Sequence, residues 1–222
     1  MSSFETINVD DLKFKIPFGM IISGPSNSGK THFLLKLLKY SEQLFKPIPK
    51  TILYVYGEYH SFIPELESEG IRICAGMPTD DMLSELPRPF LLVLDDLMLI
   101  VRENTLSELF TKKAHHQNFG VIFVTQNLFE KSMRVARNNS QYLVLMRAPN
   151  AVMQIRNLGA QLFPGQLQYF LDAYRQATLL PYGYLVLDLH AGSSPLLKVR
   201  TNIFPEESEI EKQRTVFIPS RY

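Results

Sequence analysis

The chain has 222 residues, of which 45% are hydrophobic and 20% charged, and this composition indicates one large packed domain or two small ones rather than a disordered chain. Its formal net charge of +1 excludes the global basic field that marks many nucleic-acid-binding proteins. The single cysteine, Cys74, excludes an internal disulfide and fits a reducing compartment such as the cytosol or nucleus.

Neither a signal peptide nor a membrane span is expected from the apolar segments. The first fifteen residues, MSSFETINVDDLKFK, carry acidic residues and no apolar core. The long apolar run FLLVLDDLMLIV is interrupted by Asp95 and Asp96. We therefore expect a protein that is not secreted, that has no membrane partner, and that works in the nucleus or cytoplasm.

Taken in chain order, short apolar runs alternate with helical patterns. The runs that predict strands lie at 19–23 with its flank, 51–57, 71–76, 90–95, 120–126, 141–146 and 182–189. The helical patterns lie at 31–45, 103–114, 128–137 and on both sides of Pro164. Because strands that alternate with helices need crossover connections, the predicted fold is α/β, with a mostly parallel central sheet flanked by helices.

The domain organisation is expected to be simple. Residues 1–203 form one domain, because the proline-containing breaks within them have the length of loops rather than linkers. Residues 204–222 form a charged tail that either packs on this domain or reaches a neighbouring molecule.

One loop carries the clearest chemical signal. It follows an apolar strand, precedes a helical pattern and fits G-x-x-x-x-G-K-S/T, which is typical of loops that bind nucleotide phosphates. Its residues are Gly24, Pro25, Ser26, Asn27, Ser28, Gly29, Lys30 and Thr31. The glycines let backbone N–H groups face phosphates, the lysine reaches the β- and γ-phosphates, and the threonine hydroxyl binds Mg²⁺. We expect ATP and Mg²⁺ as cofactors; the alternative is an ordinary Gly-Ser turn.

Two acids follow the buried strand at 90–95, where a P-loop protein keeps the acid that holds its metal. Asp95 is expected to hold Mg²⁺ through water. Asp96 stands where many P-loop ATPases have a glutamate that polarises the attacking water, and its shorter side chain would have to lie closer or act through a second water. The alternative for Asp96 is that it caps the following helix.

A further strand, GVIFVTQ, ends in Gln126, which is expected beside the γ-phosphate as a group that positions water or senses the nucleotide. The alternative is a polar residue that merely ends a strand. A separate strand of this kind, after the one that carries the acids, indicates the additional-strand type of P-loop NTPase, as in RecA-like and FtsK–HerA-like proteins.

Several segments together resemble a known family. The segments PFGMIISGPSNSGKT, YVYGEYH, LLVLDDL, HHQNFGVIFVTQNLF and RTNIFPEE resemble the viral genome-packaging ATPases of the FtsK–HerA superfamily. The resemblance is closest to those of polintons and adintoviruses and more distant to poxvirus-type and adenovirus-type packaging ATPases. It covers about residues 14 to 207, and VTQNLF and RTNIFPEE are more specific than the phosphate loop.

The resemblance implies a homo-oligomeric ring that hydrolyses ATP at its subunit interfaces and threads double-stranded DNA, without sequence specificity, into a capsid. It implies capsid portal or vertex proteins as partners and a place of action at the assembling virion in the host nucleus or cytoplasm. It also implies an arginine that one subunit supplies to the γ-phosphate of the next. Arg134 matches that arginine, and Arg137 is the substitute; the alternative for both is a solvated helix charge.

The sequence departs from the family pattern after the strand at 141–146. Ala148-Pro149-Asn150 and Gly159-Ala160-Gln161 lack the arginines expected there, which puts a finger or DNA-contact role for that segment in doubt. A loop carrying Lys112, Lys113, His115 and His116 is the candidate for touching DNA phosphates in a pore.

The charges are unevenly distributed along the chain. Residues 131–171 carry basic side chains with no acid, whereas 57–86 carry acidic side chains with one arginine. These stretches are either complementary surfaces of neighbouring subunits or two solvated faces.

Three functions follow as hypotheses. The first is a motor that packages DNA. The second is another P-loop DNA-dependent ATPase, such as a helicase or a domesticated host protein. The third is a nucleotide-gated binding module with little hydrolysis, which the aspartate at position 96 motivates.

Overall fold

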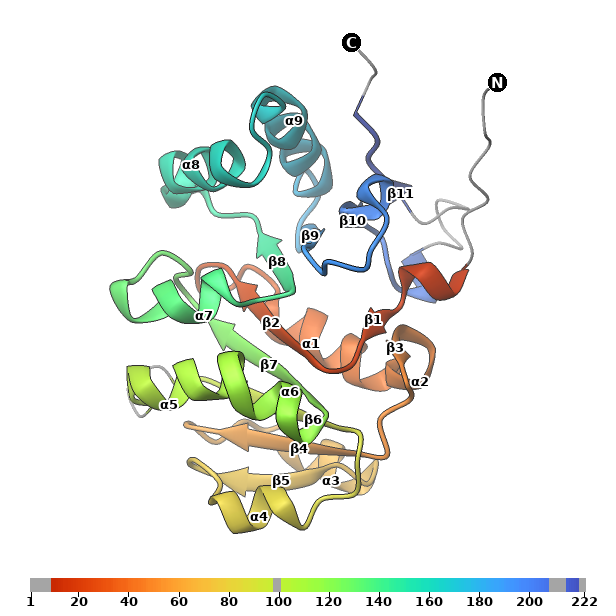
Figure 1. Cartoon of the computed structure of the whole chain (residues 1–222), viewed down its shortest axis with the longest axis vertical. Coiled ribbons are helices and arrows are strands. Elements are labelled where there is room, and N and C mark those ends of the chain that lie inside the picture. The colour runs from red at the N-terminus through yellow and green to blue at the C-terminus, as the bar shows by residue number, and fades with distance from the viewer. Residues whose placement is uncertain (1–8, 98–100, 208–214, 220–222) are drawn as a thin grey trace.

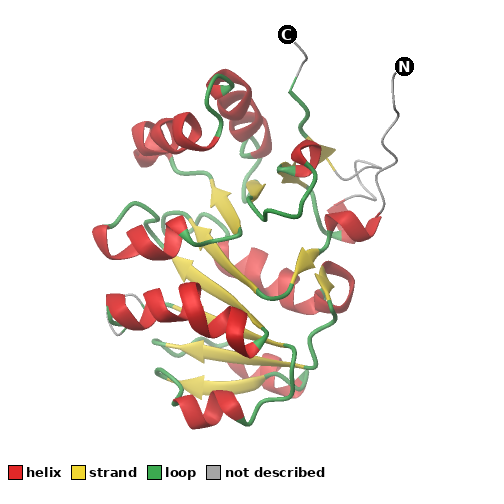
Figure 2. Cartoon of the chain, in the orientation of Figure 1, coloured by secondary structure: helices red, strands yellow, loops and turns green. Residues whose placement is uncertain are grey.

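The computed structural model describes residues 9–97, 101–207 and 215–219. Nine of the strands in these residues form one sheet in the order β11-β10-β9-β8-β2-β7-β6-β4-β5, and helices cover both of its faces (Figures 1 and 2). The strands of this sheet are β2 (Phe18–Ser23), β4 (Thr51–Tyr56), β5 (Arg72–Ala75), β6 (Phe90–Asp95), β7 (Phe119–Thr125), β8 (Tyr142–Met146), β9 (Tyr184–Asp188), β10 (Val199–Thr201) and β11 (Thr215–Val216). A separate parallel pair consists of β1 (Phe14–Lys15) and β3 (Phe45–Lys46).

The helices are short to medium in length. They are α1 (Lys30–Lys39), α2 (Ser41–Leu44), α3 (Ile63–Ser68), α4 (Asp80–Ser84), α5 (Glu103–Glu108), α6 (Ala114–Gln117), α7 (Arg134–Asn138), α8 (Val152–Leu162) and α9 (Leu167–Ala177). A π-helical segment, η2 (Leu109–Lys113), joins α5 to α6, and 3₁₀ turns lie at η1 (Val9–Leu12), η3 (Lys131–Met133), η4 (Pro149–Ala151) and η5 (Pro195–Leu197).

The sheet is parallel over most of its width. The six strands from β5 to β8 in the sheet order run parallel, whereas β9, β10 and β11 are antiparallel to their neighbours. The predicted α/β class is therefore confirmed. The continuous apolar run at 90–95 is buried throughout, because helices cover that strand on both faces.

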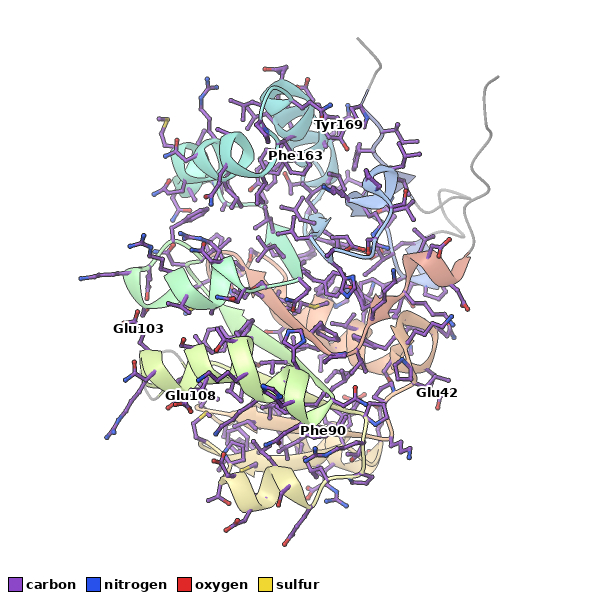
Figure 3. All side chains as sticks on the ribbon, viewed as in Figure 1. Glu42, Phe90, Glu103, Glu108, Phe163 and Tyr169 are labelled. Carbon is purple, nitrogen blue, oxygen red and sulfur yellow. The ribbon has the colours of Figure 1, made fainter. Side chains whose placement is uncertain are left out.

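The two faces of the sheet have separate apolar cores. Helices α1, α2 and α3 cover one face, and α4 to α9 cover the other. Successive residues of β6 alternate between them, with Leu92 in one core and Val93 in the other. At the far end of the second core, Phe163 and Tyr169 lie together where α8 meets α9, with ring centroids 6.0 Å apart (Figure 3).

Two predicted helices differ from the structure. The pattern at 31–45 is interrupted at Tyr40, so that α1 ends at Lys39 and α2 follows it. The helix expected from 128 begins only at residue 131, as a 3₁₀ turn. The reason is that the N–H of Leu128 donates to Ser23 Oγ (3.1 Å) and the N–H of Phe129 donates to Asn127 Oδ1 (3.0 Å), which fixes this stretch as a loop.

The expected pore loop is also different. Residues 112–116 lie within the helical stretch formed by η2 and α6. Lys113 forms an ion pair with Asp80 at 2.6 Å, so its charge is partly neutralised by its own chain. The prediction of a loop here was wrong, because the apolar residues of 106–114 pack the whole stretch onto the sheet.

The described part of the tail packs on the rest of the chain. Phe204 is fully buried, and Thr215–Val216 pairs with β10. Residues 208–214 and 220–222 of the predicted tail lie outside the described residues. The boundary at 203/204 stays a prediction.

Among the described residues, no helix combines the length and the apolar character that a membrane crossing needs.

Candidate functional site

The candidate site lies at the carboxyl edge of the parallel strands. β2 ends at Ser23 and leads into the phosphate loop, and β6 ends at Asp95. β7 lies between them, with Ser23 opposite Thr125 in the register. One strand thus separates the phosphate-loop strand from the acid strand, which is the additional-strand arrangement that the sequence predicted.

The phosphate loop is curled as its glycines predict. Asn27 and Gly29 have φ values of 61° and 100°, and the N–H of Gly24 donates to the Thr125 carbonyl (3.3 Å). A Cβ at Gly24 would come within 2.5 Å of both Met146 Cβ and Ser28 Oγ, so the loop has no room for a side chain there.

The loop fits a bound phosphate chain. Ser28 Oγ is buried and has no hydrogen-bond partner within the described residues. A buried hydroxyl normally has a partner, and a phosphate oxygen on the loop would supply it. The predicted ligand class therefore agrees with an observation that is independent of the motif.

Lys30 begins α1, and its ammonium group donates to the Pro25 carbonyl at 2.9 Å. Burial lowers the pKa of Lys30, and the carboxylates of Asp95 and Asp96 act in the opposite direction. The lysine and the two acids are therefore close enough to interact electrostatically. Thr31 is exposed in the first turn of α1, directly after Lys30.

Asp95 is 5% exposed, and its Oδ2 accepts a hydrogen bond of 2.5 Å from the Tyr54 hydroxyl. Burial raises the pKa of Asp95, opposed by the Tyr54 hydrogen bond and by the charges of His60 and Lys30. A carboxylate held in this way, together with the Thr31 hydroxyl, is the hard oxygen donor set that Mg²⁺ prefers. The residues therefore fit the implied metal.

Asp96 is exposed at the end of β6, with a left-handed backbone (φ 54°). Aspartate and asparagine tolerate this conformation better than glutamate does. The backbone therefore explains why an aspartate stands at this position. Arg102, and not Asp96, occupies the N-cap position of α5, without a side-chain cap hydrogen bond, so the structure does not support Asp96 as the cap of that helix.

Gln126 follows β7 and faces the phosphate loop. Its Oε1 accepts a hydrogen bond of 3.5 Å from Ser26 Oγ. This contact joins the additional strand to the loop and places an exposed amide at the loop, as the sequence predicted.

The two arginines that the sequence left open have different environments. Arg137 donates to the Leu128 carbonyl (3.1 Å) and lies 5.7 Å from the centroid of the Phe129 ring. The side chain of Arg134 is exposed and makes no hydrogen bond or ion pair within the described residues. Within the described residues, neither arginine forms a hydrogen bond or ion pair with the phosphate loop.

Sequence reasoning missed two features of the site. Tyr54 was read only as part of an aromatic, β-branched strand, and its contact with Asp95 needs the pairing of β4 with β6. Tyr182 was assigned to a strand, but it precedes β9 in a loop beside Gly29, where a Cβ on the glycine would lie 2.9 Å from Tyr182 Cβ. The left-handed φ of 62° at Tyr182 is not visible in the sequence.

The fold is that of a P-loop NTPase with an additional strand, and this assignment rests on the strand order and the loop. No protein-family model matches the chain, and no curated protein matches it in sequence.

Solved structures show distant similarity. The genome packaging NTPase B204 from Sulfolobus turreted icosahedral virus 2, in complex with ATP-gammaS, is 12% identical over 92% of this chain and 98% of its own, with a TM-score of 0.49. EccC from Thermomonospora curvata (ATPases 2 and 3) is 11% identical over 79% of this chain and 39% of its own, with a TM-score of 0.47. A KaiC-like protein from Pyrococcus horikoshii is 14% identical over 58% of this chain and 72% of its own, with a TM-score of 0.38.

Proposed function

We propose that this chain is an ATPase of the FtsK–HerA type that moves double-stranded DNA, as the resemblance to viral genome-packaging ATPases implies. The observation that carries the proposal is the grouping of Lys30, Asp95 and Asp96 at one sheet edge, with Gln126 in contact with the phosphate loop from the strand between them. This set of groups suits phosphoryl transfer to water.

Each residue has a separate task in the proposed reaction. The loop N–H groups and Lys30 hold the phosphates and stabilise negative charge that develops on them. Thr31 and Asp95 hold Mg²⁺, which supplies further charge neutralisation when bound. Asp96 accepts a proton from the attacking water, and Gln126 orients that water.

We propose that the active unit is a ring, with Arg134 of one subunit reaching the nucleotide of the next. The proposal is supported by the exposure of Arg134 and by the internal contacts that occupy Arg137. The acidic stretch at 57–86 includes α3, α4 and β5 at one end of the sheet. In the basic stretch, α8 lies toward the other end, and α7, which connects β7 to β8, lies near the middle (Figure 1). Acidic and basic surfaces at separate places on one subunit favour a head-to-tail contact, the geometry that generates rings.

The DNA-moving function is tested by the steady-state ATPase rate with and without long duplex DNA, for the wild type and Lys30→Ala. The expected result is a wild-type rate that rises with long duplex DNA and a rate in the variant lowered by about 10²–10³. Lys39→Gln, at an exposed position on the same helix, is the control for loss of a lysine. Hydrolysis that is indifferent to DNA of any length would contradict the motor and favour another P-loop ATPase.

A nucleotide-gated module with little hydrolysis, the third hypothesis from the sequence, stays a candidate because Asp96 replaces the usual glutamate. The distinguishing variant is Asp96→Asn, since asparagine tolerates the left-handed backbone and removes only the base. If the chain hydrolyses ATP, turnover falls by about 10²–10⁴ while ATP binding stays. Equal and very low turnover in both proteins would favour the module.

A further inference from the structure

A cavity of about 440 Å³ opens beside the phosphate loop, on the side away from the two acids. Its wall near the loop consists of His32, in the first turn of α1, and Leu180, Pro181 and Tyr182, in the connection from α9 to β9. The cavity extends between these residues toward β10 and the described end of the tail.

Strand order determines which part of a nucleotide faces this cavity. Asp95 lies on the β7 and β6 side of the phosphate loop, and the cavity lies on the β8 and β9 side. The register places Leu145 beside Ser23 and Tyr184 beside Met146, so β9 starts at the level of the loop. A γ-phosphate held with Mg²⁺ by the acids would lie on their side of the loop, so the nucleoside of the same nucleotide would leave the loop on the opposite side, toward Tyr182.

The residues at the mouth of the cavity have the character of a base-binding wall. Tyr182 and Leu180 are 62% and 64% exposed, although both are large and apolar. The rings of His32 and Tyr182 have centroids 6.3 Å apart and planes inclined at 47°. Exposed aromatic rings next to a phosphate site offer a planar base a stacking surface.

The backbone holds Tyr182 in this place. The N–H of Gly183 donates to the Leu180 carbonyl (3.1 Å), which closes a turn around it. Gly183 has no room for a side chain, since a Cβ would lie 2.4 Å from the Ala177 carbonyl oxygen. A bulky residue at φ 62° is unusual and needs such support. The backbone therefore places Tyr182 beside Gly29 of the phosphate loop, where a Cβ on the glycine would lie 2.9 Å from Tyr182 Cβ and 3.0 Å from its Cδ1.

We propose that this cavity binds the base and ribose of the nucleotide, with Tyr182 stacking on the base and Leu180 and His32 completing the wall. The inference rests on the proposed nucleotide binding and adds the residues that recognise the nucleoside. Stacking accepts any planar base, so this wall contributes affinity for the nucleoside rather than a choice between adenine and guanine.

The test is calorimetric titration of the full chain with Mg·ADP and with tripolyphosphate. The variants are Tyr182→Asn, which tolerates the left-handed backbone, and Tyr182→Phe, which keeps the ring. Leu179→Ala is the control, because Leu179 is in the same connection and 70% exposed but does not line the cavity. Tyr182→Asn is expected to weaken ADP binding by roughly tenfold and to leave tripolyphosphate binding unchanged, whereas Tyr182→Phe and Leu179→Ala stay within about twofold of the wild type.

Unchanged ADP affinity in Tyr182→Asn, or an equal loss for ADP and tripolyphosphate, would overturn the inference, since the ring would then not touch the base. If Tyr182→Asn does not fold, Leu180→Asn on the same wall decides the question in the same way. Lys30→Ala separates the two proposals: it loses both ligands if the phosphate loop binds nucleotides. A wild type that binds neither ligand would contradict the proposed function itself.

Discussion

The two parts of the sheet are stabilised in different ways. The six parallel strands from β5 to β8 have apolar residues on both faces and are covered by helices on both sides. The antiparallel part, β9 to β11, narrows to strands of three and two residues and depends on side-chain contacts. Arg200, buried in β10, forms an ion pair with Asp188 of β9 at 3.0 Å and donates to the Leu12 carbonyl.

The difference shows how the phosphate loop is supported. The parallel part positions the loop and the acids through its strand ends, where the chain must turn. The antiparallel part holds α1 from the other side: Lys36 forms ion pairs with Glu206 (2.9 Å) and Glu207 (3.3 Å), and Phe204 packs on Phe33. The parallel part thus carries the candidate site residues, and the antiparallel part holds α1, the helix that follows the phosphate loop.

The largest expected effect separates the two arginines of α7. Arg134→Ala should lower turnover by about 10³ or more without changing stability, because its side chain has no hydrogen-bond or ion-pair partner among the described residues. Arg137→Ala should instead lower the free energy of unfolding by about 1–2 kcal/mol, through loss of its contacts with Leu128 and Phe129. ATPase assays and urea titrations of both variants measure the contrast, and the reverse assignment would make Arg137 the finger.

Next in size is the anchoring of the tail. Phe204→Ala should cost about 3–5 kcal/mol of unfolding free energy, because the ring is fully buried against Phe33 and Tyr184. Ile218→Ala, at a 55% exposed position, is the control and should be nearly neutral. A small loss in Phe204→Ala, measured by urea unfolding, would mean that the antiparallel part contributes little to the fold.

The support of the metal-binding acid is the third case. Tyr54→Phe removes the donor to Asp95 and should lower the free energy of unfolding by about 1–3 kcal/mol. The loss should shrink in an Asp95→Asn background, since no buried carboxylate then remains. Tyr56→Phe, on the same strand, is the matched control. If Tyr54→Phe lowers the free energy of unfolding equally with Asp95 and with Asn at position 95, the Tyr54 hydroxyl does not act through the carboxylate.

The smallest effect concerns acid stability. Contacts with Tyr40 and Lys36 lower the pKa of Glu206 from 4.5, so the folded state binds this proton less readily than the unfolded state. Its stabilisation is therefore present above pH 4.5 and is lost as the pH falls through the lowered pKa. Because the side chain is 41% exposed, Glu206→Gln should cost less than about 1 kcal/mol at neutral pH. The difference in free energy of unfolding between Glu206→Gln and the wild type should disappear in acid. A difference that persists in acid would show that the charge of Glu206 is not the cause of the stabilisation.

The sequence predicted the parallel part well because its signals are local. Each of these signals predicts the structure of the residues that carry it. They are the apolar run at 90–95, the acids after it and the glycines of the loop. The short helices α3 and α4 were not predicted, since neither is long enough to show a period. β10 was missed because it has three residues and carries an arginine whose burial depends on Asp188.

The site was predictable to the same extent. Lys30 begins α1, Asp95 ends β6 and Gln126 follows β7, at the positions that the sequence indicated, and the roles of these residues stay predictions. Other features of the site depend on contacts between segments that are distant in the sequence, and no spacing of residues predicts them. They are the hydrogen bond from Tyr54 to Asp95, the position of Tyr182 and the different surroundings of Arg134 and Arg137.

The central claim, an active site shared between subunits, is tested most directly by mixing two inactive variants. Lys30→Ala retains the arginine and Arg134→Ala retains the lysine, so a site formed by one subunit of each kind is complete. A 1:1 mixture, co-refolded or exchanged, should recover up to about a quarter of the wild-type ATPase rate, because half of the subunits have the lysine and half of their neighbours have the arginine. A mixture as inactive as its components, although the subunits demonstrably assemble together, would contradict the account.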